Sequence, residues 1–189
     1  MHVCMRCAVA LVILVGPMAR ADFTEIIDPS EQPLWETLVG DFTTITFMEI
    51  PPVLDLDDEY QELGVTFGGD LNTFFFTPSF VNDGVGLDGN TEVRLTFDVP
   101  ITAFAMDFPG ITDVAYFRDG ERIPGGGAFG GGGVGFFYGF VSTVPFDEVL
   151  LFDDFGEVFI DDLYFGPPIP TPGSAALLLV AGILRRPRR

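Results

Sequence analysis

Apolar and polar residues alternate along much of the chain between positions 43 and 165. The clearest example is the segment 92–99, EVRLTFDV, in which Val93, Leu95, Phe97 and Val99 alternate with polar residues. A period of two places the apolar side chains on one face of a strand and the polar side chains on the other. We therefore expect a half-buried β-strand at this position.

Similar alternating or aromatic segments recur along the chain, separated by Gly, Pro and Asp-Gly turns. They are 43–50, 63–68, 101–108, 113–119, 135–142, 148–154 and 157–165. Asp119-Gly120 predicts a hairpin, because Asp-Gly favours the tight turns that join antiparallel strands. Helical periodicity is weak and confined to 34–38 and 57–63. Eight or more such strands predict an all-β fold, a single β-sandwich of jelly-roll type.

The N-terminal segment 1–21 has the composition of a secretory signal peptide. A positive charge at Arg6 precedes an apolar run over 8–15, and small residues follow at Ala19 and Ala21. This order predicts export and cleavage after Ala21. The alternatives are an uncleaved anchor, for which the run is too short, and a buried helix, for which it lies too near the start. We expect one mature domain over 22–166.

Removal of the signal peptide restricts the chemistry of the mature chain. Cys4, Cys7 and His2 all lie within residues 1–21, and the chain contains no lysine. The mature domain would therefore lack the side chains of Ser-His-Asp and Cys-His catalysis, of Cys/His zinc sites, of Schiff bases and of disulfides. These classes of enzyme and scaffold are excluded.

Charge is distributed very unevenly. All 28 acidic residues lie between Asp22 and Asp162, together with only three basic residues, so this region carries a formal net charge of −25. Nucleic acid and anionic lipid require Lys and Arg, and are therefore not expected as partners. Divalent cations or a saline medium suit such a surface better. The high apolar content, 48% of the chain, favours a packed core over disorder.

A glycine-rich segment, GGGAFGGGGVG, spans 125–135. A phosphate-binding loop would require a following helix and usually a lysine, whereas aromatic strand residues follow here. We expect a flexible hairpin loop. The alternative is a mobile lip over a binding face, with Phe129 at its tip.

Two aspartates, Asp161 and Asp162, interrupt the otherwise apolar segment 157–165, EVFIDDLYF. A charge within such a strand is costly unless it is paired or coordinated. Carboxylate oxygens are the ligands that calcium prefers. Most of the other acidic clusters are expected to be solvated turns.

Two segments resemble jelly-roll carbohydrate-binding modules and related adhesion domains: ITFMEIPP at 45–52 and IDDLYFG at 160–166. In that group an acidic residue of an early strand and an Asp of the last strand commonly hold a structural calcium. The resemblance therefore implies Glu49 and Asp161 as ligands, with Asp162 as the alternative to Asp161.

Binding of polysaccharide would require exposed aromatic rings on which sugars stack. The candidates are Trp35, Tyr116 and Tyr138. The alternative is that these rings fill the core, which is rich in phenylalanine.

The C-terminal region contains a Pro/Gly-rich spacer at 167–174, a ten-residue apolar run at 175–184 and four arginines in the last five residues. A membrane-spanning helix requires about 20 apolar residues, so the run is too short for a stable anchor. The terminal arginines are placed as expected for a cytoplasmic end. A final core strand or helix is the alternative, which the proline spacer and the terminal charge disfavour.

This order of spacer, apolar run and arginines resembles the PEP-CTERM sorting signal of exported bacterial proteins. The corresponding motif is Pro170-Thr171-Pro172-Gly173, in which Thr171 replaces the usual Glu. The resemblance implies an exosortase-type sorting protease as partner, and transient membrane association before cleavage. The Phe- and Gly-rich domain that precedes it is similar to the β domains often found with such tails.

These features together predict a non-enzymatic, exported β-sandwich protein of the cell surface or extracellular matrix. Polysaccharide is the candidate ligand, and calcium is the candidate structural ion. One alternative is a secreted glycan hydrolase, which would need only two carboxylates about 5–10 Å apart. The other is a purely structural adhesion or matrix subunit.

Overall fold

The computed structural model describes residues 22–49, 56–69, 71–75, 85–108, 110–130, 136–153, 156 and 158–166. The strands are β1 (Phe23–Ile26), β2 (Thr43–Ile45), β3 (Val65–Gly68), β4 (Leu71–Phe75), β5 (Val85–Gly89), β6 (Glu92–Phe108), β7 (Ile111–Arg118), β8 (Glu121–Arg122), β9 (Ala128–Gly130), β10 (Phe136–Phe152), β11 (Val158–Ile160) and β12 (Leu163–Gly166). The helices are α1 (Gln32–Val39) and two 3-10 turns, η1 (Pro29–Glu31) and η2 (Gln61–Leu63). The predicted all-β class is confirmed.

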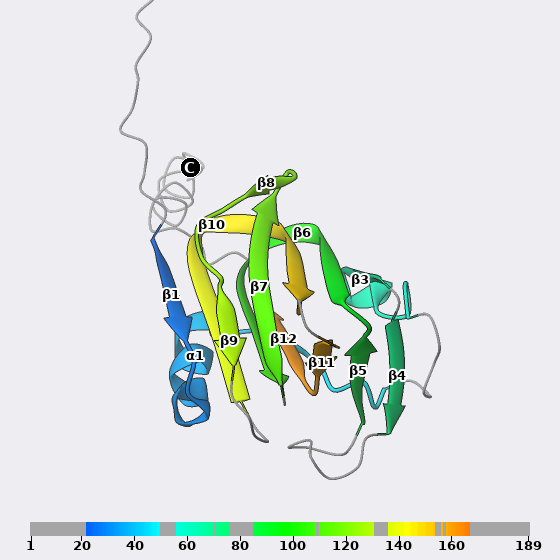
Figure 1. Ribbon diagram of the computed structural model, residues 1–189. Helices are drawn as coiled ribbons and strands as arrows, with labels where there is room; N and C mark the ends of the chain where they lie inside the picture. The colour runs from blue at the N-terminus through cyan, green and yellow to red at the C-terminus, as the bar shows by residue number, and fades with distance from the viewer. Residues whose placement is uncertain are drawn as a thin grey trace, which may run out of the picture.

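The strands form two antiparallel sheets. The larger has the order β2-β12-β6-β10-β7-β8, with β1 beside β10, β3 beside β6 and β9 beside β7. The smaller has the order β11-β5-β4 and lies at the right of the molecule in Figure 1. Side chains from both sheets meet in one large core cluster, for example Leu95 of β6, Leu87 of β5 and Ile160 of β11.

Two long strands, β6 and β10, determine the shape of the larger sheet. Each has 17 residues, and they pair along both halves with an irregular stretch between Val141 and Glu148 of β10. Buried positions of β6 change from odd numbers (93, 95, 97) to even numbers (104, 106, 108) across this stretch, yet all face the same core. The sheet therefore bends over on itself, and both strands arch across the top of the molecule in Figure 1.

The hydrophobic pattern predicts separate strands on either side of Pro100 and of Pro145, and this detail is wrong. The structure joins 92–108 into one strand and 136–152 into another. A proline at an unpaired edge position or in an irregular stretch bends a strand without ending it.

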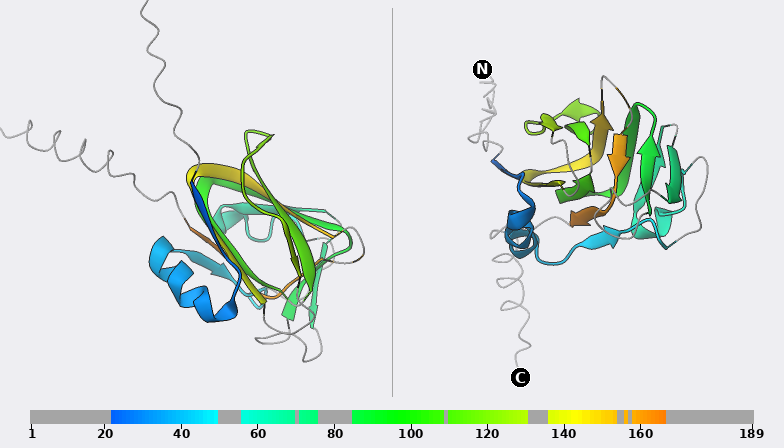
Figure 2. Two further views of the ribbon diagram at one scale, coloured as in Figure 1. Left: turned by 60° about the vertical axis from the view of Figure 1, so that its left-hand side comes forward. Right: turned by 60° about the horizontal axis from the view of Figure 1, so that its bottom comes forward.

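Helix α1 covers part of the outer face of the larger sheet, as Figure 2 shows. Its Trp35 is fully buried in a second, smaller cluster with Phe137 and Tyr164. Gly139 of β10 provides the space, because a Cβ there would overlap the Trp35 ring. Both α1 and η2 coincide with the two segments of weak helical periodicity.

The hairpin predicted at Asp119-Gly120 is confirmed. These two residues join β7 to β8 with φ angles of 52° and 78°, and Arg118 pairs with Glu121 across the turn. Two consecutive residues with positive φ are typical of the turn that matches the twist of an antiparallel pair.

The predicted signal peptide (1–21), spacer and sorting motif (167–174) and apolar segment (175–189) lie outside the described residues and stay predictions. Within the described part of the chain, no helix is long and apolar enough to cross a membrane.

Candidate functional site

Three carboxyl groups and one tyrosine gather at the passage from β11 to β12, and we call Asp107, Asp161, Asp162 and Tyr164 the carboxylate cluster. The Asp161 N–H donates to the Asp107 carbonyl, and the Asp107 N–H donates to the Asp162 carbonyl, both at 2.8 Å. These bonds continue the pairing of β12 with β6 and fix the two segments together. The side chains are deeply buried, with exposed fractions of 7% for Asp107, 1% for Asp161 and 6% for Asp162.

The Tyr164 hydroxyl links two of these carboxyl groups. Its oxygen lies 2.7 Å from Asp107 Oδ2 and 3.2 Å from Asp162 Oδ2. A tyrosine hydroxyl carries one proton, so it can donate to only one carboxylate at a time. If one of the two carboxyl groups were also protonated, it could donate to the Tyr164 oxygen while the phenol donates to the other carboxylate, and both contacts would be hydrogen bonds.

The electrostatics of the cluster favour that extra proton. Burial raises the pKa of Asp107 to about 6; the hydrogen bond from Tyr164 acts in the opposite direction, and the charge of Asp161 adds to the rise. Burial and the nearby Asp107 and Asp162 raise the pKa of Tyr164, so the phenol stays protonated. The cluster therefore takes up a proton in mildly acidic solution.

Sequence reasoning singled out Asp161 and Asp162 and missed Asp107. The available signal was the same for all three, an Asp within an apolar run, because Asp107 follows Ala105-Met106 and precedes Phe108. The antiparallel pairing of Leu163 with Met106 brings the two runs together. Such a pairing between distant strands cannot be deduced from either segment alone.

Glu49, the third predicted metal ligand, has hydrogen-bond partners of its own. Its Oε1 accepts from the Thr46 N–H at 3.1 Å and from Thr46 Oγ1 at 3.0 Å, and its Oε2 accepts from Tyr60 Oη at 3.2 Å. Partial burial acts to raise the pKa of Glu49, but these hydrogen bonds outweigh it and the pKa is lowered.

The donor chemistry of Glu49, Asp161 and Asp162 fits calcium, since all of their ligand atoms are carboxylate oxygens. Their arrangement gives no geometric support, because among the described residues no group of three or more Asp, Glu, His or Cys side chains could hold a metal ion. Calcium at these residues stays a prediction.

The three aromatic residues proposed for glycan contact require a correction. Trp35, Tyr116 and Tyr138 are fully buried, each with an exposed fraction of 0%. Sugar stacking requires an accessible ring face, and none of these rings offers one. They are core residues, in agreement with the alternative considered for them.

The two buried tyrosines also have internal hydrogen-bond partners. Tyr116 Oη donates to Tyr138 Oη at 3.0 Å, and Tyr138 Oη donates to Glu25 Oε1 at 3.3 Å. The Gly126 N–H donates to the same Glu25 oxygen at 2.7 Å. The Tyr116 ring stacks on Phe140, with ring centroids 3.9 Å apart. This chain of contacts connects β1, the core and the start of the glycine-rich segment.

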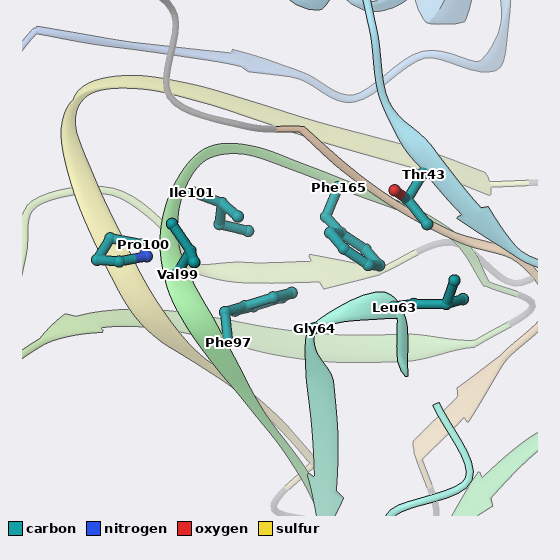
Figure 3. A pocket seen from close by; sticks show the side chains of 8 residues that line it. All are labelled: Thr43, Leu63, Gly64, Phe97, Val99, Pro100, Ile101 and Phe165. Carbon is teal, nitrogen blue, oxygen red and sulfur yellow. The ribbon is translucent and has the colours of Figure 1, made fainter. Parts of the chain in front are cut away.

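An accessible concave site lies on the opposite edge of β6 from β10. It is an apolar pocket of about 210 Å³, shown in Figure 3. Its lining residues are Thr43, Leu63, Gly64, Phe97, Val99, Pro100, Ile101 and Phe165. The Phe97 and Phe165 rings are in contact, with centroids 5.2 Å apart. Leu63 and Val99 are exposed, Val99 by 65%.

The pocket lies between the two strands that pair with this edge of β6. β3 pairs with Arg94–Phe97, and β12 pairs with Ala103–Met106 on the same edge. Residues 98–102 of β6 lie between these two pairings. At one end the Asp98 N–H donates to the Gly64 carbonyl at 3.0 Å. Pro100, at the centre of this stretch, has no N–H to donate to a partner strand.

Comparisons of the chain with protein-family models, with curated proteins and with solved structures find no match. What the domain can do chemically therefore follows from the two sites themselves. The carboxylate cluster takes up a proton in mildly acidic solution, but its side chains are shielded from solvent. The apolar pocket is accessible and suits apolar groups, since Thr43 supplies its one polar side chain.

Proposed function

We propose that this chain is a non-enzymatic β-sandwich module of an exported protein that is carried to the cell surface or extracellular matrix. Export and sorting are supported by the signal-peptide pattern of residues 1–21 and by the resemblance of 170–189 to a PEP-CTERM signal. The proposal assigns the β domain a structural or adhesive role.

The burial of the carboxylate cluster supports the proposal that the domain is not an enzyme. Hydrolysis of a glycan requires two carboxyl groups that reach the scissile bond from an accessible cleft. Asp107, Asp161 and Asp162 are at most 7% exposed, and Tyr164 occupies the space between two of them. The accessible pocket is apolar and lacks a carboxyl group in its lining. Both features favour a scaffold over a hydrolase.

The test is a turnover assay of the purified protein on a panel of acidic and neutral polysaccharides, with release of reducing ends as the readout. We expect no release above a buffer blank. Release that disappears in an Asp162→Asn variant of unchanged melting temperature would overturn the proposal in favour of the hydrolase.

Polysaccharide binding is a separate part of the proposal, because it requires no catalysis. A glycan array probed with the purified protein distinguishes a glycan-binding module from a purely structural subunit. Binding would then have to use surface residues other than Trp35, Tyr116 and Tyr138, because these three rings are enclosed in the core.

Sorting is tested by mass spectrometry of the protein isolated from its host. We expect an N-terminus at Asp22 and a C-terminus close to Pro172. A chain that retains Arg189 would contradict sorting by cleavage, and would leave the non-enzymatic role of the domain unaffected.

A further inference from the structure

The apolar pocket has the size of one side chain. Its volume is about 210 Å³, below the roughly 300–1,000 Å³ of sites that enclose a drug-sized molecule. An apolar cavity of about 150 Å³ is enough to hold a benzene ring. The pocket therefore accepts a single aromatic ring or branched aliphatic group, and the remainder of a larger occupant lies outside it.

The walls of the pocket combine buried rings with exposed aliphatic side chains. The contacting rings of Phe97 and Phe165 are buried, and in Figure 3 Val99 and Leu63 stand on either side of them. Leu63 is 45% exposed and Val99 is 65% exposed. An apolar group seated here would remove both side chains from water. Pockets with this construction receive the anchoring side chains of protein partners.

The surface beside the pocket is acidic. Asp41, Glu62 and Asp98 are exposed, and each lies within two positions of a lining residue in the chain. The Asp98 N–H donates to the carbonyl of Gly64, which lines the pocket, and the Asp41 carbonyl lies close to Gly166 at the end of β12. Among the described residues, none of the three carboxylates takes part in an ion pair.

The arginines of the described chain do not compensate this charge. Arg94 forms an ion pair with Glu148. Arg118 and Arg122 belong to β7 and β8, and β8 lies four strands from β12 in the larger sheet. The region beside the pocket therefore repels acidic surfaces and attracts basic ones. A second copy of this chain is disfavoured as occupant, because each copy carries a formal net charge of −25 over 22–166.

We propose that the apolar pocket is the docking site of a basic protein, which inserts one aromatic or branched aliphatic side chain flanked by Lys or Arg. The inserted side chain covers Leu63 and Val99, and the flanking cations face Asp41, Glu62 and Asp98. An apolar centre with a polar rim is the usual arrangement of a protein interface. This partner class rests on the adhesive role proposed above, and a failure to bind leaves the turnover and sorting tests unaffected.

The test is a calorimetric titration of the purified full chain with a synthetic pentapeptide that has a central leucine between two pairs of lysines. We expect saturable binding that weakens as sodium chloride is added. In one control peptide serine replaces the leucine, and the loss of the buried side chain should weaken binding by about tenfold or more. In the other, glutamates replace the lysines, and like charge should prevent binding.

A matched pair of leucine variants locates the bound peptide. Leu63→Ser should weaken binding by about fivefold or more, as expected for an anchoring contact. Leu34→Ser should leave it unchanged, because Leu34 lies on α1 and has a similar exposed fraction, 50% against 45%. If Leu63→Ser lowers the melting temperature, Val99→Ser takes its place, since Val99 is more exposed.

A matched pair of double variants tests the charges at equal net charge. Glu62→Gln with Asp98→Asn should weaken binding by about threefold or more and reduce its salt dependence. Glu31→Gln with Glu121→Gln removes two exposed carboxylates elsewhere and should have a smaller effect.

Four results would overturn the proposal. They are no binding at millimolar peptide, equal affinity for the leucine and serine peptides, equal affinity for the lysine and glutamate peptides, and equal effects of the pocket variant and Leu34→Ser. The second result would mean that charge alone attracts the peptide, and the fourth that the peptide binds at another place.

Discussion

At the scale of single residues, two glycines with nearly the same φ angle are required for different reasons. Gly120 has φ of 78° and open space around its Cα, so its role in the β7–β8 turn is conformational. Gly126 has φ of 79°, and a Cβ there would overlap the carbonyl of Val114. The adjacent Gly125 is packed against the Phe140 ring. The start of the glycine-rich segment is therefore shaped by close packing as well as by its conformation.

This difference predicts unequal effects of substitution by alanine. Gly120→Ala should reduce the free energy of unfolding by about 1–2 kcal/mol, the cost of a left-handed conformation. Gly126→Ala incurs the same cost and must also displace β7, so we expect a loss of about 3–4 kcal/mol. Urea denaturation of both variants measures the two losses. Losses equal within about 0.5 kcal/mol would show that packing at Gly126 has no effect.

Asp107 makes stability depend on pH. Its folded pKa of about 6 exceeds the ordinary value of 3.8, so between these pH values the folded state binds more protons than the unfolded state. The stabilising contribution is complete below about pH 4 and is lost as the pH rises through 6. Two pKa units correspond to about 2–3 kcal/mol.

The matched variant is Asp107→Asn, which keeps an oxygen that accepts from Tyr164 and does not titrate. We expect the difference in unfolding free energy between the natural chain and this variant to change by about 2–3 kcal/mol between pH 4 and pH 7. Denaturant unfolding at several pH values measures it. Carboxylates that do not interact with Asp107 contribute equally in both chains and cancel, so a constant difference would show that Asp107 has an ordinary pKa.

At the scale of secondary structure, α1 is attached to the sheet mainly through one side chain. Trp35 fills the space above Gly139, and its ring nitrogen donates to the Phe140 carbonyl at 3.4 Å. The rest of the helix is more exposed; Leu34, for example, is half exposed. Attachment through Trp35 connects residues more than one hundred positions apart in the chain.

Removal of this attachment has a large predicted effect. Trp35→Ala should lower the free energy of unfolding by about 3–5 kcal/mol, since it leaves a cavity the size of an indole ring. Leu34→Ala, one residue away on the same helix, should change it by no more than about 0.5 kcal/mol. Thermal unfolding monitored by circular dichroism compares the two. A small effect of Trp35→Ala would mean that α1 contributes little to the fold.

At the scale of the whole molecule, negative charge dominates. The region 22–166 carries 28 carboxyl groups and three arginines, two of which, Arg94 and Arg118, form ion pairs with nearby acidic residues. The remaining charges repel one another, and salt screens this repulsion. Sodium chloride should therefore raise the melting temperature without a specific site.

The calcium prediction requires an effect beyond that of screening. At pH 7.5 we expect millimolar calcium to raise the melting temperature by several degrees more than sodium chloride of equal ionic strength. The additional rise should disappear in Asp161→Ala. Equal melting temperatures with calcium and with a chelator at pH 7.5 would contradict a calcium site.

The sequence predicts elements well where a pattern is local. Alternation over 92–99, the Asp119-Gly120 turn and the weak helix around Trp35 all correspond to observed elements. It fails where strands from distant parts of the chain combine. The partnership of Asp107 with Tyr164, the burial of Tyr116 and the pocket between β3 and β12 depend on pairings across the sheet, which no short segment encodes.

The bent strands β6 and β10 have a consequence for how the molecule comes apart. Because both strands contribute to both halves of the larger sheet, neither half retains a complete set of neighbours once the other is lost. Unfolding should therefore be a single cooperative event, with slow hydrogen exchange of similar rate in both halves of β6. For the exported module that we propose, fewer partly open forms would mean fewer sites at which a protease can begin to cut.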